Sequence, residues 1–466
     1  MNLTYGIKDR PRFGQIVLFA IQQLLAIMAA TIAVPAVVNS VTGSDMTASA
    51  ALFGAGCGSI VYLLFTKSKS PVFLGSSFAF LGSMFSAFGA AASMAIGYAG
   101  LIIGALMAGL VYVIIAIVVK VCGVKWIGKL MPPVVIGPTV AIIGLSLAGN
   151  AVGDSVKSSV EGGSTYVALI CALVTLAVAM LASTYGKKMM KLIPFIIGIL
   201  AGYLTASIFA LIGKSTGNAA LVVIDYSALT TIDSFVSLPV FSFTRADFAG
   251  VDAGYLLTLF VAYVPVAFVV FAEHLADHEN LSTIVGVNLI EEPGLTRTLL
   301  GDGIGSMVGA FFGGCPNTTY GESIACVAIT RNASTISIWG AAVACIIFSL
   351  ITPLVAFLQT IPACVMGGVC FALYGFIAAS GLKMLQPVDL NKNRNLFVAS
   401  VIFIAGVGNL SVSFGAVEIR TVACALILGI LTNVMLSKEK DEEPAEKKAE
   451  QKRFIRRFAE NRNRPK

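Results

Sequence analysis

Apolar residues along this chain gather into long runs separated by short polar stretches, a pattern that predicts an all-α polytopic membrane protein. Residues 100–119 form one such run, and about 20 apolar residues make a helix that crosses a hydrocarbon layer of about 30 Å. Fourteen transmembrane segments are expected, at residues 14–39, 47–66, 71–90, 95–119, 133–150, 164–184, 192–213, 253–273, 299–314, 320–331, 335–358, 363–381, 395–411 and 414–436.

The charges between these segments predict that both termini are cytoplasmic. Cytoplasmic loops of membrane proteins are enriched in Lys and Arg. The loop at residues 40–46 and the turn near residue 360 carry neither. The loops after the even-numbered segments carry Lys67, Lys69, Lys120, Lys125, Lys129, Lys187, Lys188, Lys191, Arg331, Lys383, Lys392 and Arg394. The first segment follows a charged stretch without a cleavage site, so we expect it to remain as an anchor.

Two pairs of similar segments predict an internal repeat. The motif Pro-x-x-Val-x-Gly occurs within residues 130–137 and again within 360–367, at the starts of the fifth and twelfth segments. The third and tenth segments each open with a proline, a short β-prone run and a glycine, at Pro71–Gly75 and Pro316–Gly321. An offset of seven segments gives the two halves opposite topology, which is typical of secondary transporters. Paired interrupted segments of this kind indicate a substrate site at the membrane midplane.

Ionisable residues within these segments are the candidates for chemistry. Glu322 stands at the head of the interrupted tenth segment, and Glu273 and Asp277 are four residues apart, on one helical face. The two histidines of the chain, His274 and His278, form a second pair beside them. A charge inside a membrane span costs at least about 2.5 kcal/mol, which favours a functional role. A structural ion pair remains the alternative for the glutamates, and a solvated helix end for Asp277 and the histidines.

Composition supports the membrane assignment and limits the kinds of partner that we expect. The chain has 466 residues, of which 57% are hydrophobic and 12% charged, against about 25% charged in soluble proteins. Much of the net charge of +7 lies after Ser437, in a tail that we expect to be disordered or to lie on anionic lipid rather than to bind nucleic acid. The nine cysteines lack metal-ligand or disulfide-framework spacing, and we interpret them as apolar packing residues.

Four motifs together resemble a known family. They are EHLADHENLSTI (273–284), EEPGLTRTLLGDG (291–303), NTTYGES (317–323) with Thr330 and Arg331 after it, and IPACVMGGVCFALYGFIAASGL (361–382). On these motifs the chain is similar to the nucleobase–ascorbate transporter family, also called nucleobase:cation symporter-2, and in particular to the bacterial uracil permeases. The likeness spans most of residues 14–436 and is strongest over 265–385.

The resemblance implies a fold and an assembly. It implies fourteen segments in two inverted seven-segment repeats, with short antiparallel strands in segments 3 and 10, in a homodimer formed through the gate domains in the cytoplasmic membrane. The implied divisions are a cytoplasmic N-terminus (1–13), a first repeat (14–213; core spans 1–4, gate spans 5–7), an extracytoplasmic loop (214–252), a second repeat (253–436; core spans 8–11, gate spans 12–14) and a charged cytoplasmic tail (437–466).

The resemblance also implies a function and its residues. It implies a proton-coupled uracil symporter that works by alternating access, with co-transported H⁺ but no catalytic residue, resident cofactor or metal. On the family pattern the substrate-binding residues are Phe78, Glu273, Tyr320, Gly321, Glu322 and Tyr374, and the proton-coupling candidates are Glu273, Asp277 and His278. The sequence departs from the family signature at Ser323 and Ala325, where relatives have Asn and Gly, and at Asp277, where some have His.

Uracil chemistry fits these residues independently of the family. Uracil has two N–H donors and two carbonyl acceptors, which suit carboxylates and the free N–H groups of a helix start. The resemblance adds a further point: purine-type members of the family usually have Gln at the position of Glu322, so Glu there favours a pyrimidine. Three alternatives remain: a symporter for xanthine, uric acid or another nucleobase; an anion transporter of sulphate-transporter architecture, which two carboxylates disfavour; and a membrane enzyme, for which the sequence offers no nucleophile–base pair.

Overall fold

The computed structural model describes residues 3–123, 132–187, 189–230, 232, 234–414, 417–419 and 421–438. Some expectations fall on other residues. Lys125, Lys129 and Lys188, the first two residues of the 130–137 motif and the tail after Lys438 lie outside the described residues.

Helices make up most of the described chain. In its first half the elements are α1 (Phe13–Thr42), α2 (Ala48–Phe65), β1 (Leu74–Ser76), η1 (Phe78–Phe80), α3 (Leu81–Gly89), α4 (Met94–Cys122), α6 (Pro133–Ser146), α7 (Ala148–Ser155), α8 (Thr165–Tyr185), α9 (Met189–Leu192), α10 (Pro194–Thr216), η2 (Ala219–Leu221), α11 (Ser227–Thr230) and α12 (Ser242–Arg245).

The second half repeats this alternation of long and short helices. Its elements are α13 (Ala253–Val285), η3 (Ile290–Gly294), α14 (Leu295–Gly313), β2 (Asn317–Thr319), α15 (Gly321–Thr330), α16 (Thr335–Leu350), α17 (Thr352–Gln359), α18 (Ala363–Met384), α19 (Asn393–Val407), β3 (Val412–Phe414), β4 (Val417–Ile419), α20 (Thr421–Met435) and η4 (Leu436–Lys438).

The length and polarity of the helices confirm a polytopic membrane protein. Among the described residues, eight helices are apolar and long enough to cross a membrane: α1, α2, α4, the consecutive pair α6–α7, α8, α10, α13 and α18. Shorter apolar helices occupy most of the remaining expected segments. The total of fourteen crossings and the inversion of the repeats stay predictions.

Several segment boundaries differ from the expected ones. The eighth segment was expected to end at residue 273, but α13 continues to Val285, where Gly286 in the left-handed region ends it. The last was expected from residue 414, but α20 begins at Thr421 after the hairpin of β3 and β4. The segments 133–150 and 335–358 are each divided into two helices.

Polar side chains set where several helices begin. The side chains of Thr47, Ser93 and Asp252 each accept a hydrogen bond from the backbone N–H three residues later, at the starts of α2, α4 and α13. Such N-caps satisfy one of the N–H groups that the first turn leaves without a partner. The polar residues between apolar runs therefore fix the ends of the helices as well as separate them.

The strands expected in the third and tenth segments pair antiparallel. Leu74 lies opposite Thr319 and Ser76 opposite Asn317. The Ser59 hydroxyl of α2 holds the start of β1, because its Oγ accepts from the Leu74 N–H at 2.8 Å and donates to the Leu74 carbonyl at 3.1 Å. Each strand leads directly into a helix start, η1 followed by α3, or α15. The pair thus brings two helix starts together in the interior.

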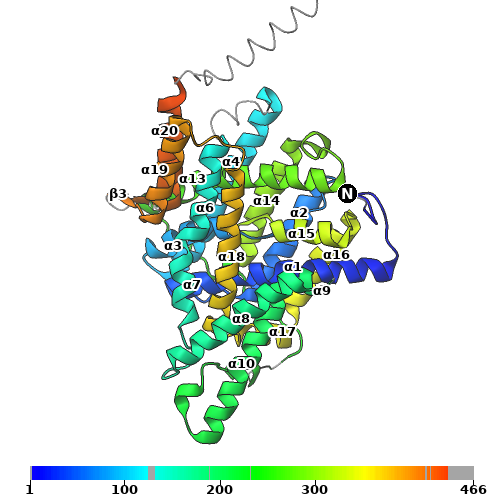
Figure 1. The fold of residues 1–466 in the computed structure, drawn as a ribbon, viewed down its shortest axis with the longest axis vertical. Coiled ribbons are helices and arrows are strands. Elements are labelled where there is room, and N and C mark those ends of the chain that lie inside the picture. The colour runs from blue at the N-terminus through cyan, green and yellow to red at the C-terminus, as the bar shows by residue number, and fades with distance from the viewer. Residues whose placement is uncertain are drawn as a thin grey trace, which may run out of the picture.

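The long helices pack as two groups. The strand group consists of α1–α4 and α13–α16 around β1 and β2, in which α14 packs on α2 and α4, and α16 on α1 and α2. The α6–α18 group consists of α6–α8, α10 and α18–α20. Figure 1 shows α6 and α18 side by side, with α8 and α10 at one end of the molecule and α19 and α20 at the other. The members correspond to the segments expected in the core and gate domains, and that domain assignment stays a prediction.

Small residues allow α2 and α14 to approach closely. A Cβ atom built on Gly58 would lie 2.7 Å from the Gly305 carbonyl oxygen, so only glycine fits there. The same interface holds the buried side chain of Asn317 from β2, whose Nδ2 donates to the Gly54 carbonyl at 3.0 Å. Glycine contacts of this kind are common where membrane helices pack. Here the glycine contacts allow the strand pair to pack against α2 and α14.

Candidate functional site

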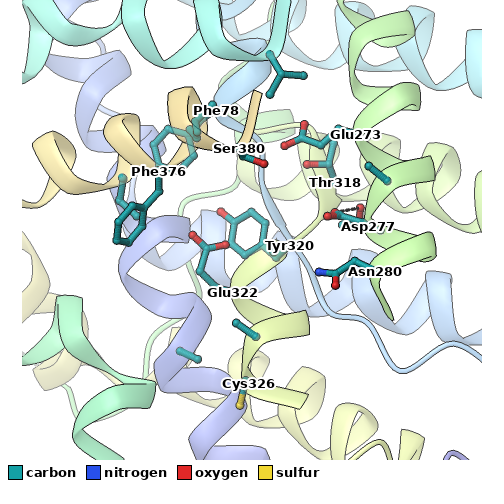
Figure 2. Close-up of a pocket in the computed structure, with 18 of the residues that line it drawn as sticks. Phe78, Glu273, Asp277, Asn280, Thr318, Tyr320, Glu322, Cys326, Phe376 and Ser380 are labelled. Carbon is teal, nitrogen blue, oxygen red and sulfur yellow. Dashed lines mark hydrogen bonds between the residues drawn. The ribbon is translucent and has the colours of Figure 1, made fainter. Parts of the chain in front are cut away.

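A cavity of about 620 Å³ lies where the two groups meet (Figure 2). Ligand-binding pockets usually measure about 300–1,000 Å³, so this one is large enough for a small organic molecule. The strand group contributes the residues after each strand and one face of α13, and the α6–α18 group contributes α6, α18 and the start of α10. The labelled wall residues in Figure 2 are Phe78, Glu273, Asp277, Asn280, Thr318, Tyr320, Glu322, Cys326, Phe376 and Ser380.

Tyr320 links the two strand–helix junctions on the cavity wall. Its hydroxyl donates to the Ser76 carbonyl at 2.6 Å, and its N–H donates to the Phe73 carbonyl at 3.3 Å. The ring lies against Gly75, and a Cβ on Gly75 would lie 2.8 Å from Cδ2 of the ring, closer than real Cβ contacts allow. Gly75, which interrupts the third segment, must therefore be a glycine to leave room for the Tyr320 ring of the tenth.

Glu273 and Glu322 line the same cavity from different helices. Glu273 lies in the middle of α13, and Glu322 is the second residue of α15. Figure 2 shows Tyr320 between the two carboxylates. A helix start favours negative charge because its N–H groups have no carbonyl partner one turn earlier. The same property makes the Gly321–Glu322 backbone, which also lines the cavity, suitable for acceptors on a ligand.

Asp277 connects α13 to the strand pair. Its Oδ2 accepts a hydrogen bond from the Thr319 hydroxyl at 2.8 Å, and its side chain lines the cavity. Because Asp277 lies one helical turn after Glu273, three carboxylates reach one cavity. Lys191 and Lys383 also line it, from α9 and α18. The charged residues that the strand group contributes to the wall are therefore all acidic.

The two histidines point away from the cavity and are fully buried. His274 Nδ1 lies 2.7 Å from Asp302 Oδ2 of α14. His278 Nε2 lies 2.7 Å from the Tyr62 hydroxyl of α2, and its Nδ1 is 2.8 Å from the His274 carbonyl oxygen. The solvated-helix-end alternative is thus wrong for both, because α13 continues past them and each side chain contacts a neighbouring helix, α14 or α2. His278, a proton-coupling candidate, does not line the cavity.

Tyr374, expected to line the pocket, lies behind the wall instead. Its ring is buried and meets Phe78 edge-to-face, with the ring centroids 5.8 Å apart. Phe78 itself lines the cavity at the start of η1. Of the six expected binding residues, Phe78, Glu273, Tyr320, Gly321 and Glu322 line the cavity and Tyr374 does not.

Sequence reasoning missed several polar groups at this site. Ser323, noted only as a departure from the family signature, accepts a hydrogen bond from the Phe73 N–H at 3.0 Å and another from the Gln23 side chain of α1. Gln23 was an available signal, because a polar residue in the middle of an apolar span is costly without a partner. The apolar residues on the α6–α18 side of the wall gave no comparable signal, because side chains such as Ile143 and Phe376 are typical of any membrane helix.

A cavity between two packed groups of membrane helices, lined by paired strands and helix starts, defines a membrane transport protein. A family model described as "Permease family" matches residues 14–414. The chain therefore belongs to this family, the nucleobase:cation symporter-2 permeases. This membership confirms a transporter and not an enzyme.

Relatives with assigned names match almost the whole chain. A protein named uracil permease from Bacillus caldolyticus is 39% identical over 92% of this chain and 94% of its own length. Uracil permeases from Bacillus subtilis (strain 168) and Escherichia coli (strain K12) are 36% and 35% identical, over 95% and 91% of this chain and 97% and 92% of theirs.

Solved structures show the same fold at much lower sequence identity. The transmembrane domain of the cyanobacterial bicarbonate transporter BicA superposes with a TM-score of 0.60 at 17% identity, over 92% of this chain and 99% of that domain. The murine anion transporter Slc26a9 in its inward-facing state gives 0.63 at 12% identity, over 92% of this chain and 69% of the other. These likenesses concern the fold alone.

Proposed function

We propose that this chain is a proton-coupled uracil symporter of the cytoplasmic membrane that works by alternating access. The observation that carries the proposal is the pair of carboxylates, Glu273 and Glu322, on one cavity beside the strand–helix junctions. The names of the matched relatives support uracil as the substrate.

The wall offers a complement to each polar group of uracil. The carboxylates of Glu273 and Glu322 accept from the two ring N–H groups, and charge-assisted bonds of this kind are stronger than neutral ones. The backbone N–H groups at the starts of η1 and α15, at Phe78 and Gly321, donate to the two carbonyls. Tyr320 supports both junctions and covers one side of the site. Tyr374 acts indirectly in this proposal, by holding the Phe78 ring.

The proton site is Glu273 in this proposal, with Asp277 as its neighbour. Uracil is neutral at pH 7, so its accumulation needs a co-transported ion. Two carboxylates one turn apart on α13 repel each other when both are charged, and a proton on either one relieves that repulsion. The hydrogen bond from Thr319 to Asp277 couples that second carboxylate to the strand pair. His278 contacts Tyr62 and the backbone of His274 instead.

Uptake of labelled uracil into proteoliposomes with an imposed pH gradient tests the proposal. Wild-type protein should accumulate uracil when the outside is acidic, and dissipating the gradient should abolish accumulation. Glu273→Gln and Glu322→Ala should each nearly abolish it. Glu279→Gln is the matched control, because Glu279 is an exposed carboxylate on α13 that does not line the cavity. Wild-type-like uptake by either cavity variant would refute the site assignment.

Competing bases separate uracil from the alternatives. Unlabelled xanthine and uric acid should compete weakly, and a base that competes more strongly than uracil would identify another nucleobase as the substrate. Bicarbonate or sulphate should neither compete nor drive currents, because the strand-group side of the wall carries three carboxylates. Currents driven by either anion would revive the anion-transporter alternative.

We further propose cytoplasmic termini and a homodimer formed through the α6–α18 group, as the family resemblance implies. Exposed large apolar side chains on α8 and α10 are available for such an interface or for lipid, including Leu173, Leu181, Leu204 and Leu211. Light scattering of the purified protein, corrected for detergent, measures the number of chains. Proteolysis of tags at each end, in sealed vesicles of known orientation, tests the topology.

A further inference from the structure

A second, smaller cavity adjoins the first. It measures about 260 Å³ and is lined by α1, α3, α6, α7 and α13 and by residues around Asn409 and Thr421. The two cavities have three wall residues in common, Phe78, Ala79 and Ile143. These three residues, called the septum below, are all that the two walls share.

The septum is apolar, and its residues come from both helix groups. Phe78 and Ala79 belong to η1 of the strand group, and Ile143 belongs to α6 of the other. All three are buried, with exposed fractions of 8%, 6% and 3%. The Tyr374 ring of α18 meets the Phe78 ring edge-to-face, so the α6–α18 group contacts η1 there as well. A movement of one group relative to the other would therefore separate both Ile143 and Tyr374 from η1 without breaking any helix.

The cavities lead to opposite ends of the transmembrane segments. The walls of the larger one include Ser183 at the end of α8 and Lys383 at the end of α18, both on the side proposed to be cytoplasmic. The walls of the smaller one include Val41 at the end of α1, Asn150 in α7 and Thr421 at the start of α20, all on the opposite side. The septum is what separates the two routes.

We infer that the smaller cavity is an outer vestibule through which a flat, neutral heterocycle reaches the central cavity, and that Ile143 against Phe78 and Ala79 is the outer gate. The identity of the heterocycle and the assignment of the outer side rest on the proposed function; the gate between the two cavities does not. Ser83, Asn150 and Asn409 supply polar groups on the vestibule wall.

Two-sided thiol labelling tests the gate without any substrate. Ser380→Cys places a probe in the central cavity and Asn150→Cys places one in the vestibule. A small membrane-impermeant thiol reagent is added to intact cells or to inside-out vesicles. Peptide mass spectrometry assigns the labelled position, so the native cysteines can stay. We expect Asn150→Cys to react from outside and Ser380→Cys only from inside.

Ile143→Ala should make Ser380→Cys react from outside at least tenfold faster than it does with Ile143 intact. Ile143→Val should give a smaller increase, and it keeps the test valid if the alanine variant folds poorly. The matched controls are Val140→Ala, which widens only the central cavity, and Leu147→Ala, which widens only the vestibule. Both lie on or next to α6 one turn away, and neither should connect the cavities.

The inference is overturned if Ile143→Ala and Ile143→Val leave outside labelling of Ser380→Cys unchanged, or if Val140→Ala raises it equally. It is also overturned if Asn150→Cys reacts only from inside. A protein that labels as expected but transports no uracil would refute the proposed function and leave the gate intact. Normal uracil uptake with unchanged labelling would refute the gate alone.

Discussion

Glu322→Gln and Glu322→Ala should weaken uracil binding by different factors, because they remove different parts of one interaction. A hydrogen bond to a charged group contributes about 1.5–3 kcal/mol, and roughly half of that reflects the charge. Glutamine can still accept through its carbonyl, so Glu322→Gln should lose about 1 kcal/mol, or about fivefold in Kd. Alanine leaves a ring N–H without a partner, and the loss should reach about 3 kcal/mol, or about 100-fold.

Equilibrium binding of radiolabelled uracil to purified protein at a fixed pH measures both losses. Thermal melting without ligand checks that each variant is folded, and Glu279→Gln provides the carboxylate control on the exposed side of α13. The reasoning fails if Glu322→Ala binds within twofold of wild type. It also fails if the glutamine variant is weakened as much as the alanine variant, since the carboxylate would then act through something other than its acceptor oxygens.

Two further substitutions test the packing that supports the site. Gly75→Ala should destabilise the protein by about 1–3 kcal/mol and so lower its melting temperature, because the new methyl group meets the Tyr320 ring. Gly82→Ala should not, because no neighbouring element lies within 4 Å of its new Cβ. Equal melting temperatures of the two variants would contradict the argument. Asp302→Ala should destabilise the protein by about 1–3 kcal/mol in the same assay, because it leaves the buried His274 Nδ1 without its hydrogen-bond partner. A melting curve like that of wild type would show that the contact contributes nothing.

The strand pair shows what the positions of proline and glycine in the sequence can predict. Proline, a β-prone run and glycine marked both interrupted segments, and both contain a three-residue strand. The β-prone runs noted in the sequence, residues 72–74 and 318–320, are displaced by one or two residues from β1 and β2. The register of the strand pair could not be predicted from the sequence, because tertiary contacts set it. Ser59 fixes the start of β1, and Asn317 anchors β2 to α2.

The end of α13 is a boundary that the hydrophobic pattern predicted wrongly. Polarity after Glu273 indicated the end of a membrane span, yet the helix continues for three more turns. The polar side chains there have interior partners rather than water: His274 meets Asp302, His278 meets Tyr62, and Asp277 meets the strand pair. A hydropathy profile averages over helix faces, so it cannot distinguish a solvated end from a helix whose polar side chains are satisfied by neighbouring helices.

The two helix groups contribute different kinds of residue to the cavity, and this difference supports the alternating-access proposal. The carboxylates of Glu273 and Glu322, together with both helix starts, belong to the strand group, whose internal contacts include the β1–β2 pair and the glycine-lined interface of α2 with α14. Ile143 and Phe376 face them from α6 and α18. Sliding one group past the other would therefore preserve the geometry that recognises the substrate while changing only the surface that closes over it. A binding site built across both groups would have to break its own hydrogen bonds at every cycle. Here the carboxylates and helix starts stay together in one group, and the facing Ile143 and Phe376 exchange apolar contacts, which are non-directional and readily re-formed.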